Sequence, residues 1–278
     1  FTIARVCLED MGTVSGESLF RCMLGQIQSR LQLEDFTLED MRQIMEDCKD
    51  ALSHSALPLE TVRECQIEYL IVENKLLHYF GRFPESLSKT QEILSLLYRC
   101  ECHNEELIGS MWAEYGVAIK ETSTLQNALE TLEKAMVICP ESKYLRFVYL
   151  THMSARYASF DPKQARTYLL EIQALEPFLN LPDRVHNRVN LATIQFYCGN
   201  CDEAQSDGSR LIRETYNLGM RNEEGRLANL LGCVALHRGD RSEAHRCFKR
   251  GLDIFHRESY VAYLWPLLAN LSTLYWQC

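Results

Sequence analysis

The sequence contains little proline and glycine, the two residues that most often interrupt helices, with 7 prolines and 13 glycines in 278 residues. Alternating runs of Val, Ile and Thr, which are typical of strands, are also scarce. Leu, Ala, Glu, Arg and Gln are abundant instead, and they favour helix. The composition therefore predicts an all-α protein and argues against a fold built on β-sheets.

The chain has no run of Lys or Arg, and its formal net charge is −9. An acidic protein repels phosphate backbones over most of its surface, so we expect no direct binding of nucleic acid. No apolar stretch approaches the roughly 18–20 residues that a membrane span needs, so we expect no membrane partner. The chain starts at Phe1 without an initiator Met or a signal peptide and stops at Cys278 within a helical pattern, which indicates a piece of a longer protein.

Twelve cysteines are scattered along the chain, mostly within helical apolar patterns. Disulfide-rich scaffolds are small and dense in cysteine, and a chain of 278 residues is neither. Buried reduced thiols, which behave as small hydrophobic groups, explain this distribution better. The cysteines therefore predict a cytoplasmic protein.

Motifs of enzymes are missing. No serine lies in Gly-x-Ser-x-Gly, no glycine-rich phosphate loop occurs, and the 8 histidines form no His-x-x-x-His pair with an acidic neighbour. We expect the pairs Glu105-Glu106 and Glu223-Glu224 to be solvated charges at helix starts. The sequence predicts no catalytic residue, no cofactor and no enzymatic activity.

Two short cysteine motifs contain the residue types of zinc or redox sites. The motif from Cys198 to Cys201 is a Cys-x-x-Cys, and a zinc site there would need further ligands. The candidates one repeat later are Cys233, His237 and Cys247. We favour a turn between helices at Gly199-Asn200, and we expect a helix end at residues 100–103, where the spacing Cys-x-Cys-His suits no standard zinc module. No metal is therefore expected.

One motif recurs along the chain at near-constant intervals. Its clearest copy contains Trp112, Tyr115, Gly116 and Ile119, followed by Ala128, Leu132, Ala135 and Pro140. A second copy contains Leu231, Gly232, Ala235, Gly239 and Asp240, followed by Ala244, Phe248 and Gly251. Weaker copies lie around Ala165, Ala192 and Trp265. A set of residues that recurs in this way is typical of helical-repeat arrays.

These copies place repeat starts near residues 67, 109, 146, 185, 225 and 262. Residues 17–33 and 37–55 form one further helix pair without the motif. We therefore predict an N-terminal segment with a capping helix pair at 1–60, and a repeat array at 61–278 whose last repeat is incomplete.

Small residues allow two helices to approach closely, so we expect Gly116 to lie against Ala128 and Gly232 against Ala244. Large residues such as Leu132, Leu169 and Phe248 then fill the space toward the following repeat. We expect Pro140 and Pro177 to end second helices, because proline cannot continue the intrahelical hydrogen bonds.

The repeated pattern resembles the tetratricopeptide repeat. The resemblance implies an all-α, right-handed superhelical solenoid of antiparallel helix pairs. The long repeats and the series from Leu230 through Ala244 and Phe248 to Trp265 also look similar to the sensor arrays of signal-transducing NTPase regulators. In those proteins an NTPase module precedes a helical-repeat domain that reads an inducer or a partner. NTPase motifs are absent here, so this resemblance covers the sensor alone.

In the tetratricopeptide type, the first helix of each pair lines a concave groove. Counting from the predicted starts, the resemblance places these residues in the groove: Lys75, His78, Lys120, Phe147, Tyr157, His186, Phe196, Arg226, Asn229, Tyr263 and Asn270. Amides and aromatics of this kind can hold an extended peptide, and the cations can hold a carboxylate or a small anionic inducer. The carboxylate clamp of chaperone-binding relatives is disfavoured, because its middle positions correspond to Thr193, Leu230 and Asn270.

The leading hypothesis is a non-catalytic domain that binds a protein, a peptide or an inducer and acts as scaffold or sensor of a larger regulatory protein. The alternative is a structural subunit that docks through convex or terminal surfaces, because Trp265, Leu268 and Trp276 of the last repeat would leave apolar area exposed.

Overall fold

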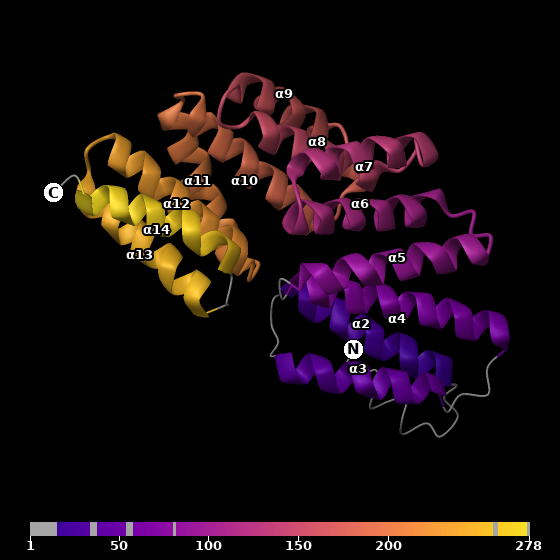
Figure 1. Ribbon diagram of the computed structural model, residues 1–278. Coiled ribbons are helices and arrows are strands. Elements are labelled where there is room, and N and C mark those ends of the chain that lie inside the picture. Colours follow the sequence, from indigo (N-terminus) through magenta and orange to yellow (C-terminus); the bar gives the residue numbers. More distant parts are fainter. Residues whose placement is uncertain (1–15, 34–37, 54–57, 80–81, 258–260, 277–278) are drawn as a thin grey trace. The chain divides into compact units, whose positions relative to one another are not determined.

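The computed structural model describes residues 16–33, 38–53, 58–79, 82–257 and 261–276, and all regular elements in these ranges are helices (Figure 1). The first helices of successive pairs are α2 (Gly16–Leu33), α4 (Leu59–Tyr79), α6 (Glu105–Thr122), α8 (Lys143–Tyr157), α10 (Leu181–Tyr197), α12 (Arg221–His237) and α14 (Val261–Trp276). The second helices are α3 (Leu38–Ser53), α5 (Phe83–Arg99), α7 (Leu125–Ile138), α9 (Pro162–Gln173), α11 (Cys201–Asn217) and α13 (Arg241–Arg257). The prediction of an all-α fold is confirmed for the described residues.

The helices follow the predicted pairing. Each predicted repeat start, from residue 67 to residue 262, lies within a first helix, and the helix pair expected at 17–33 and 37–55 corresponds to α2 and α3. The two members contact each other in the pairs α2/α3, α4/α5, α6/α7, α10/α11 and α12/α13. Among the described residues, no helix combines the length and the apolar character that crossing a bilayer requires.

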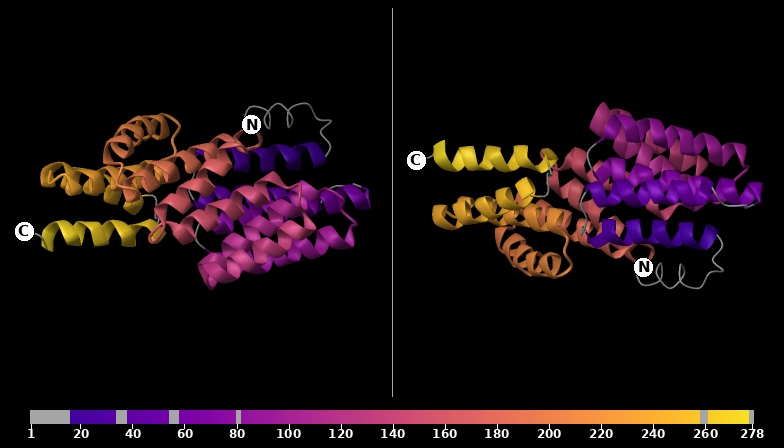
Figure 2. Two further views of the ribbon diagram at one scale, coloured as in Figure 1. Left: turned by 90° about the horizontal axis from the view of Figure 1, so that it is seen from above. Right: turned by 90° about the horizontal axis from the view of Figure 1, so that it is seen from below.

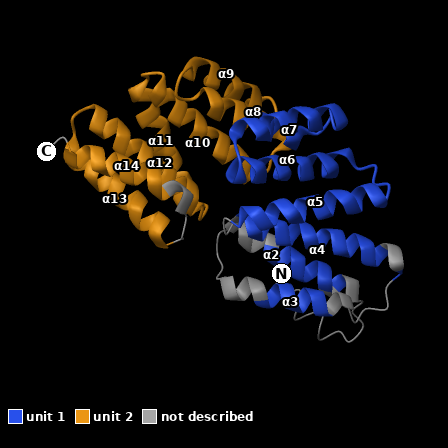
Figure 3. Ribbon diagram, viewed as in Figure 1, with its two compact units in different colours: residues 1–149 blue, residues 150–278 orange. Residues whose placement is uncertain are grey.

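Two compact units divide the chain, unit 1 at residues 1–149 and unit 2 at residues 150–278 (Figure 3). Within each unit the helices lie side by side, as the two further views also show (Figure 2). The division falls inside α8 and concerns packing, so the expected boundary between a capping pair and the array near residue 60 stays a prediction.

Short polar side chains fix where several helices begin. The side-chain oxygens of Asn104, Thr124, Asp161 and Asn180 each accept a hydrogen bond from the backbone N–H three residues later, at 2.8–3.1 Å. Each bond satisfies one of the backbone donors that a helix start leaves without an intrahelical partner.

Three turns in unit 2, after α10, α11 and α12, contain a glycine in the left-handed conformation. Gly199 and Gly239 have φ angles of +84° and +79°, a left-handed backbone conformation that residues with a Cβ rarely adopt. Both turns were predicted, and the turn at Gly219, with φ of +72°, was not.

The two prolines expected to end second helices lie in different surroundings. α7 ends directly before Cys139 and Pro140, whereas α9 ends at Gln173, and Pro177 lies in a separate 3-10 turn, η1 (Glu176–Phe178).

The expected contacts of the helix-pairing glycines need correction. The atoms nearest to a Cβ added at Gly116 belong to Leu132, the closest at 2.6 Å, and those nearest to a Cβ at Gly232 belong to Phe248. Ala128 and Ala244 are fully buried, but the space that each glycine leaves is filled by the large residue one helical turn further on. Leu132 and Phe248 therefore pack within their own helix pair, because a bare Cα leaves room for a branched or aromatic side chain.

Candidate functional site

The first helices of unit 2 carry a row of polar and aromatic side chains that are at least partly exposed. We name this row the first-helix face, and it comprises His186, Asn190, Thr193 and Phe196 on α10, Arg226, Asn229, Cys233 and His237 on α12, and Asn270 on α14. α12 contacts both α10 and α14, which brings the three helices together. Five of the predicted groove residues, His186, Phe196, Arg226, Asn229 and Asn270, lie on this face.

A buried carboxylate holds the N-terminal part of the face together. Glu223, in the first turn of α12, accepts a 2.7 Å hydrogen bond from Nη1 of Arg226 and lies 2.9 Å from Nδ1 of His186. Nη2 of Arg226 also donates to Oδ1 of Asn190 on α10. The guanidinium is thus fixed between two helices, because it bonds to groups on both.

The charge of Glu223 depends on these neighbours. Burial alone would raise the pKa of Glu223, but the charge of Arg226 and then that of His186 outweigh it and lower the pKa to about 2. The carboxylate is therefore ionised at neutral pH and neutralises one cation of the face. The prediction that Glu223-Glu224 are solvated charges at a helix start is wrong, since the two residues are only 5% and 3% exposed. They lie at a helix start as expected, within the first turn of α12, but their arginine partners Arg221, Arg226 and Arg250 were not foreseen.

Two asparagines form the centre of the face. Nδ2 of Asn270 donates to Oδ1 of Asn229 at 2.9 Å and to Sγ of Cys233 at 3.3 Å. In the described part of the chain, Nδ2 of Asn229 and Oδ1 of Asn270 have no further hydrogen-bond partner. The pair thus offers one donor and one acceptor side by side, which is the complement of a peptide group.

The C-terminal part of the face is aromatic. The rings of Phe196 on α10 and His237 on α12 meet edge to face, with centroids 6.2 Å apart. Burial raises the pKa of the neighbouring Cys233 to about 11, so its thiol stays protonated at neutral pH and is no ready nucleophile.

The remaining predicted groove residues have different surroundings. Lys75 and Lys120 are exposed in unit 1, and Nζ of Lys120 pairs with Glu121 at 2.9 Å. Tyr157 is half-buried between the rings of Phe160 and Tyr168. Phe147 is buried and cannot line an open groove, and the side chain of Tyr263 lies outside the described residues.

His78 belongs to a second bridge between first helices, in unit 1. Its Nδ1 lies 2.8 Å from Oε2 of Glu114 on α6, and the hydroxyl of Tyr144 on α8 donates to the other oxygen of Glu114 at 3.2 Å. Burial would raise the pKa of Glu114, but the hydrogen bond from His78 and its charge lower it. His78 is thus tied to a neighbouring helix rather than projecting freely.

The cysteine motifs lie at helix boundaries. Cys198 caps α10 and Cys201 begins α11, with Gly199 and Asn200 in the turn between them, as the sequence indicated. The motif at residues 100–103 follows the end of α5. In the described ranges, no three His, Cys, Asp or Glu side chains are grouped so that they could hold a metal ion.

Comparison with known proteins gives structural matches alone, since no family model and no curated protein matches the sequence. A Rap protein complexed with competence and sporulation factor matches 96% of this chain and 74% of its own, with 10% identity and a TM-score of 0.66. PlcR from Bacillus thuringiensis, solved with the peptide PapR7 and DNA, matches 84% of each chain, with 14% identity and a TM-score of 0.54.

A third match decides the fold type. A STAND protein from Pyrococcus horikoshii with a tetratricopeptide repeat sensor matches 92% of this chain, with 14% identity and a TM-score of 0.57. The present chain spans 38% of that protein. The chain has a tetratricopeptide-like fold.

Three residues at the first-helix face were missed by the sequence-based prediction. Asn190, Glu223 and His237 were not predicted to line the groove, although each contacts a predicted residue across one repeat step. Glu223 follows His186 by 37 positions, close to the repeat length, and this separation is the one signal of the contact that the sequence contains.

Proposed function

We propose that this chain is a non-catalytic helical-repeat module that binds an extended peptide, or a peptide segment of a protein, on the first-helix face of unit 2. The observation that carries the proposal is the Asn229–Asn270 pair, which leaves one donor and one acceptor directed to no other described residue. An extended peptide needs such a pair for its backbone and can place a side chain against Phe196 and His237.

Charge favours a peptide over a small anionic inducer at this face. Glu223 already neutralises Arg226, whose guanidinium is fixed by Glu223 and Asn190. Lys75 and Lys120, the other predicted cations of the groove, lie on helices of unit 1. An anion at the face of unit 2 would therefore meet no uncompensated permanent cation among the predicted groove residues of that unit.

We infer that the module serves as scaffold or sensor of a larger regulatory protein in the cytoplasm. Two structures of similar fold, the Rap protein and PlcR, were solved with competence and sporulation factor and with the peptide PapR7. A third belongs to a signal-transduction ATPase whose tetratricopeptide repeats form a sensor. The cysteines that the structure describes are free thiols, as a reducing compartment requires.

The test removes the two amides together. Peptides are selected from a random heptapeptide library on the immobilised wild-type protein, synthesised with a fluorescent label and titrated against Asn229→Ala/Asn270→Ala. Since the two side chains bond mainly to each other, their joint removal leaves little unsatisfied, and melting should change little. We expect binding to weaken about tenfold, corresponding to two lost hydrogen bonds.

A matched control is the exposed amide pair at the α10–α11 turn, where Nδ2 of Asn200 donates to Oε1 of Gln195 at 2.9 Å. The variant Gln195→Ala/Asn200→Ala should bind the selected peptides like the wild type. Equal binding by both double variants, or a failure to select any peptide, would remove the first-helix face as the binding site. Arg226→Ala is unsuitable for this purpose, because it would leave the carboxylate of Glu223 buried without its main partner.

A second candidate function is docking through α14. The residues Trp265, Leu268 and Trp276 are 72%, 41% and 90% exposed. Exposed apolar groups on one helix favour association with another protein surface. Light scattering after size exclusion tests this candidate: concentration-dependent association that Trp265→Ser/Trp276→Ser abolishes would support it, and strictly monomeric wild-type protein would argue against it.

A further inference from the structure

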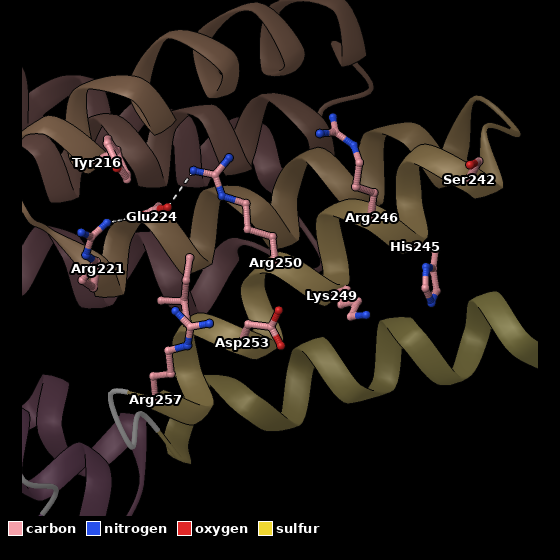
Figure 4. Close-up of a pocket in the computed structure, with 11 residues that line it drawn as sticks. Tyr216, Arg221, Glu224, Ser242, His245, Arg246, Lys249, Arg250, Asp253 and Arg257 are labelled. Atoms are coloured by element: carbon pink, nitrogen blue, oxygen red, sulfur yellow. Dashed lines mark hydrogen bonds and ion pairs between the residues drawn. The ribbon is translucent and has the colours of Figure 1, made fainter.

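A basic groove lies along α13 in unit 2, on residues that the first-helix face does not use (Figure 4). Its volume is about 900 Å³. The lining side chains include five permanent cations, Arg221, Arg246, Lys249, Arg250 and Arg257, against the carboxylates of Glu224 and Asp253. Tyr216 and Ile254 add one aromatic and one aliphatic side chain to the lining.

Two of the arginines are held in place by a buried carboxylate. Glu224, whose side chain is 4% exposed, accepts 2.7 Å hydrogen bonds from Nη1 of Arg221 and Nη2 of Arg250 (Figure 4). The guanidinium of Arg221 also lies 4.9 Å from the ring centre of Tyr216, a cation–π distance. One negative charge thus orients two positive groups. Because these side chains are already ordered, a ligand loses less free energy in ordering them on binding.

The other cations are available to a ligand. Lys249 and Arg257 are exposed and have no acidic partner within ion-pair distance in the described part of the chain. Arg246 pairs with Glu243 of its own helix and is still 76% exposed. Arg246 and Arg250 extend to the same side of α13 and also line a neighbouring groove of about 450 Å³, so the positive surface continues beyond the first groove.

The charge of the rest of the chain shows that this surface is local. Unit 1 contains 14 Lys and Arg against 24 Asp and Glu, a formal charge of −10, and unit 2 contains 15 against 14, a charge of +1. A nucleic acid carries negative charge along its whole length, and the formal net charge of −9 of the chain opposes its binding outside the basic grooves. A short acidic segment of a protein meets positive charge only where it binds.

We propose that the groove along α13 binds an acidic segment of a partner protein. From Arg246 to Arg257 the helix rises about 16 Å, which matches about five residues of extended chain. Carboxylates of the segment pair with Arg246, Lys249 and Arg257, where a planar guanidinium can hold a carboxylate with two hydrogen bonds. Tyr216 and Ile254 provide a place for an aromatic or aliphatic side chain between the acidic ones.

The experiment measures fluorescence anisotropy of a labelled peptide that alternates Glu with Leu over about five residues, the length that the helix segment matches. The test protein carries Arg246→Gln, Lys249→Gln and Arg257→Gln, which leave the pairs of Glu224 intact. The control carries Arg156→Gln, Lys163→Gln and Arg166→Gln, three exposed cations of α8 and α9 in the same unit. Both variants lose the same formal charge.

We expect the groove variant to bind the peptide about tenfold more weakly than the wild type, and the control to change the affinity by about twofold or less. Equal weakening by both variants would show an effect of net charge alone and overturn the proposal. A labelled single-stranded oligonucleotide that binds as tightly as the peptide would overturn the assignment to an acidic protein segment.

A further variant, Glu224→Gln, separates positioning from charge. The substitution removes a negative charge from the groove, so electrostatic attraction alone would make the acidic peptide bind more tightly. If Glu224 orients Arg221 and Arg250, the affinity falls about threefold or more instead, with the helical circular dichroism unchanged. Tighter binding by Glu224→Gln would contradict this role of the buried carboxylate. The amide variants of the first-helix face should not affect this peptide, so the two sites can fail independently.

Discussion

The two units contain the same kind of contact between first helices, a glutamate that meets a histidine of the preceding first helix, but they support it differently. In unit 1, Glu114 is paired with His78 and Tyr144, neither of which carries a permanent charge. In unit 2, Glu223 is paired with His186 and the permanent cation Arg226. The comparison indicates that unit 2 has the more strongly charge-paired contact.

Hydrogen bonding shows the same contrast. Nε2 of His78 is buried and has no hydrogen-bond partner among the described residues, so the contact in unit 1 leaves one polar atom unsatisfied. Both oxygens of the glutamate are bonded in each unit, but in unit 2 Arg226 also reaches a second helix through Asn190. A satisfied network fixes its side chains, whereas an unsatisfied atom leaves a cost that a rearrangement can remove.

Removing the charge of each carboxylate should show most clearly how the two contacts differ in their contribution to stability. We expect Glu223→Gln to lower the free energy of unfolding by about 3 kcal/mol, because Arg226 loses its ionic partner in a largely buried site. Glu114→Gln should cost about 1 kcal/mol, because its partners are hydrogen-bonding groups without permanent charge. Urea unfolding followed by circular dichroism measures both, and equal losses would contradict the difference between the units.

The pairing glycines give the next largest effect. A methyl group at Gly232 would overlap the ring of Phe248, which is fully buried, so Gly232→Ala should destabilise the protein by about 2 kcal/mol. Gly116→Ala should cost about 1 kcal/mol, because Leu132 can change its rotamer more easily than a ring. The double variant Gly232→Ala/Phe248→Leu is the control, and no recovery of stability in it would exclude this steric cause.

The pH dependence of stability should distinguish Glu223 by its sign and its range. Its pKa is about 2 in the folded protein against an ordinary 4.5, so its contribution is complete above pH 4.5 and is lost as the pH falls toward 2. The stability gap between wild type and Glu223→Gln should shrink by about 1–2 kcal/mol between about pH 5 and pH 3. A gap that stays constant over this range would contradict the ionised, arginine-paired carboxylate.

The smallest effect is expected at an exposed ion pair of unit 2. Arg238 pairs with Asp202, whose side chain is 94% exposed. Solvent and salt screen such a pair, so Arg238→Gln should change the free energy of unfolding by about 0.5 kcal/mol or less. A loss as large as that of Glu223→Gln would show that burial does not set the order of these effects.

The helix pairs could be predicted from the sequence because their residue types act locally. Gly199 and Gly239 mark turns, and the recurring small residues mark helix pairs. Contacts between side chains of consecutive repeats were harder to predict, because a single sequence does not show which residues contact each other. Glu223 therefore appeared as a surface charge, although Arg226 and His186 bury and neutralise it. The partner of Gly232 was misassigned to Ala244 for the same reason, since spacing alone does not say which side chain fills a space.

The central claim is that the first helices of unit 2 form the peptide-binding surface. Hydrogen–deuterium exchange of the wild-type protein, with and without a peptide selected from the random library, tests it directly. We expect the peptide to slow exchange in α10, α12 and α14, at residues 181–197, 221–237 and 261–276, and to leave α11 at 201–217 unchanged. Protection confined to unit 1, or to α13 alone, would contradict the claim.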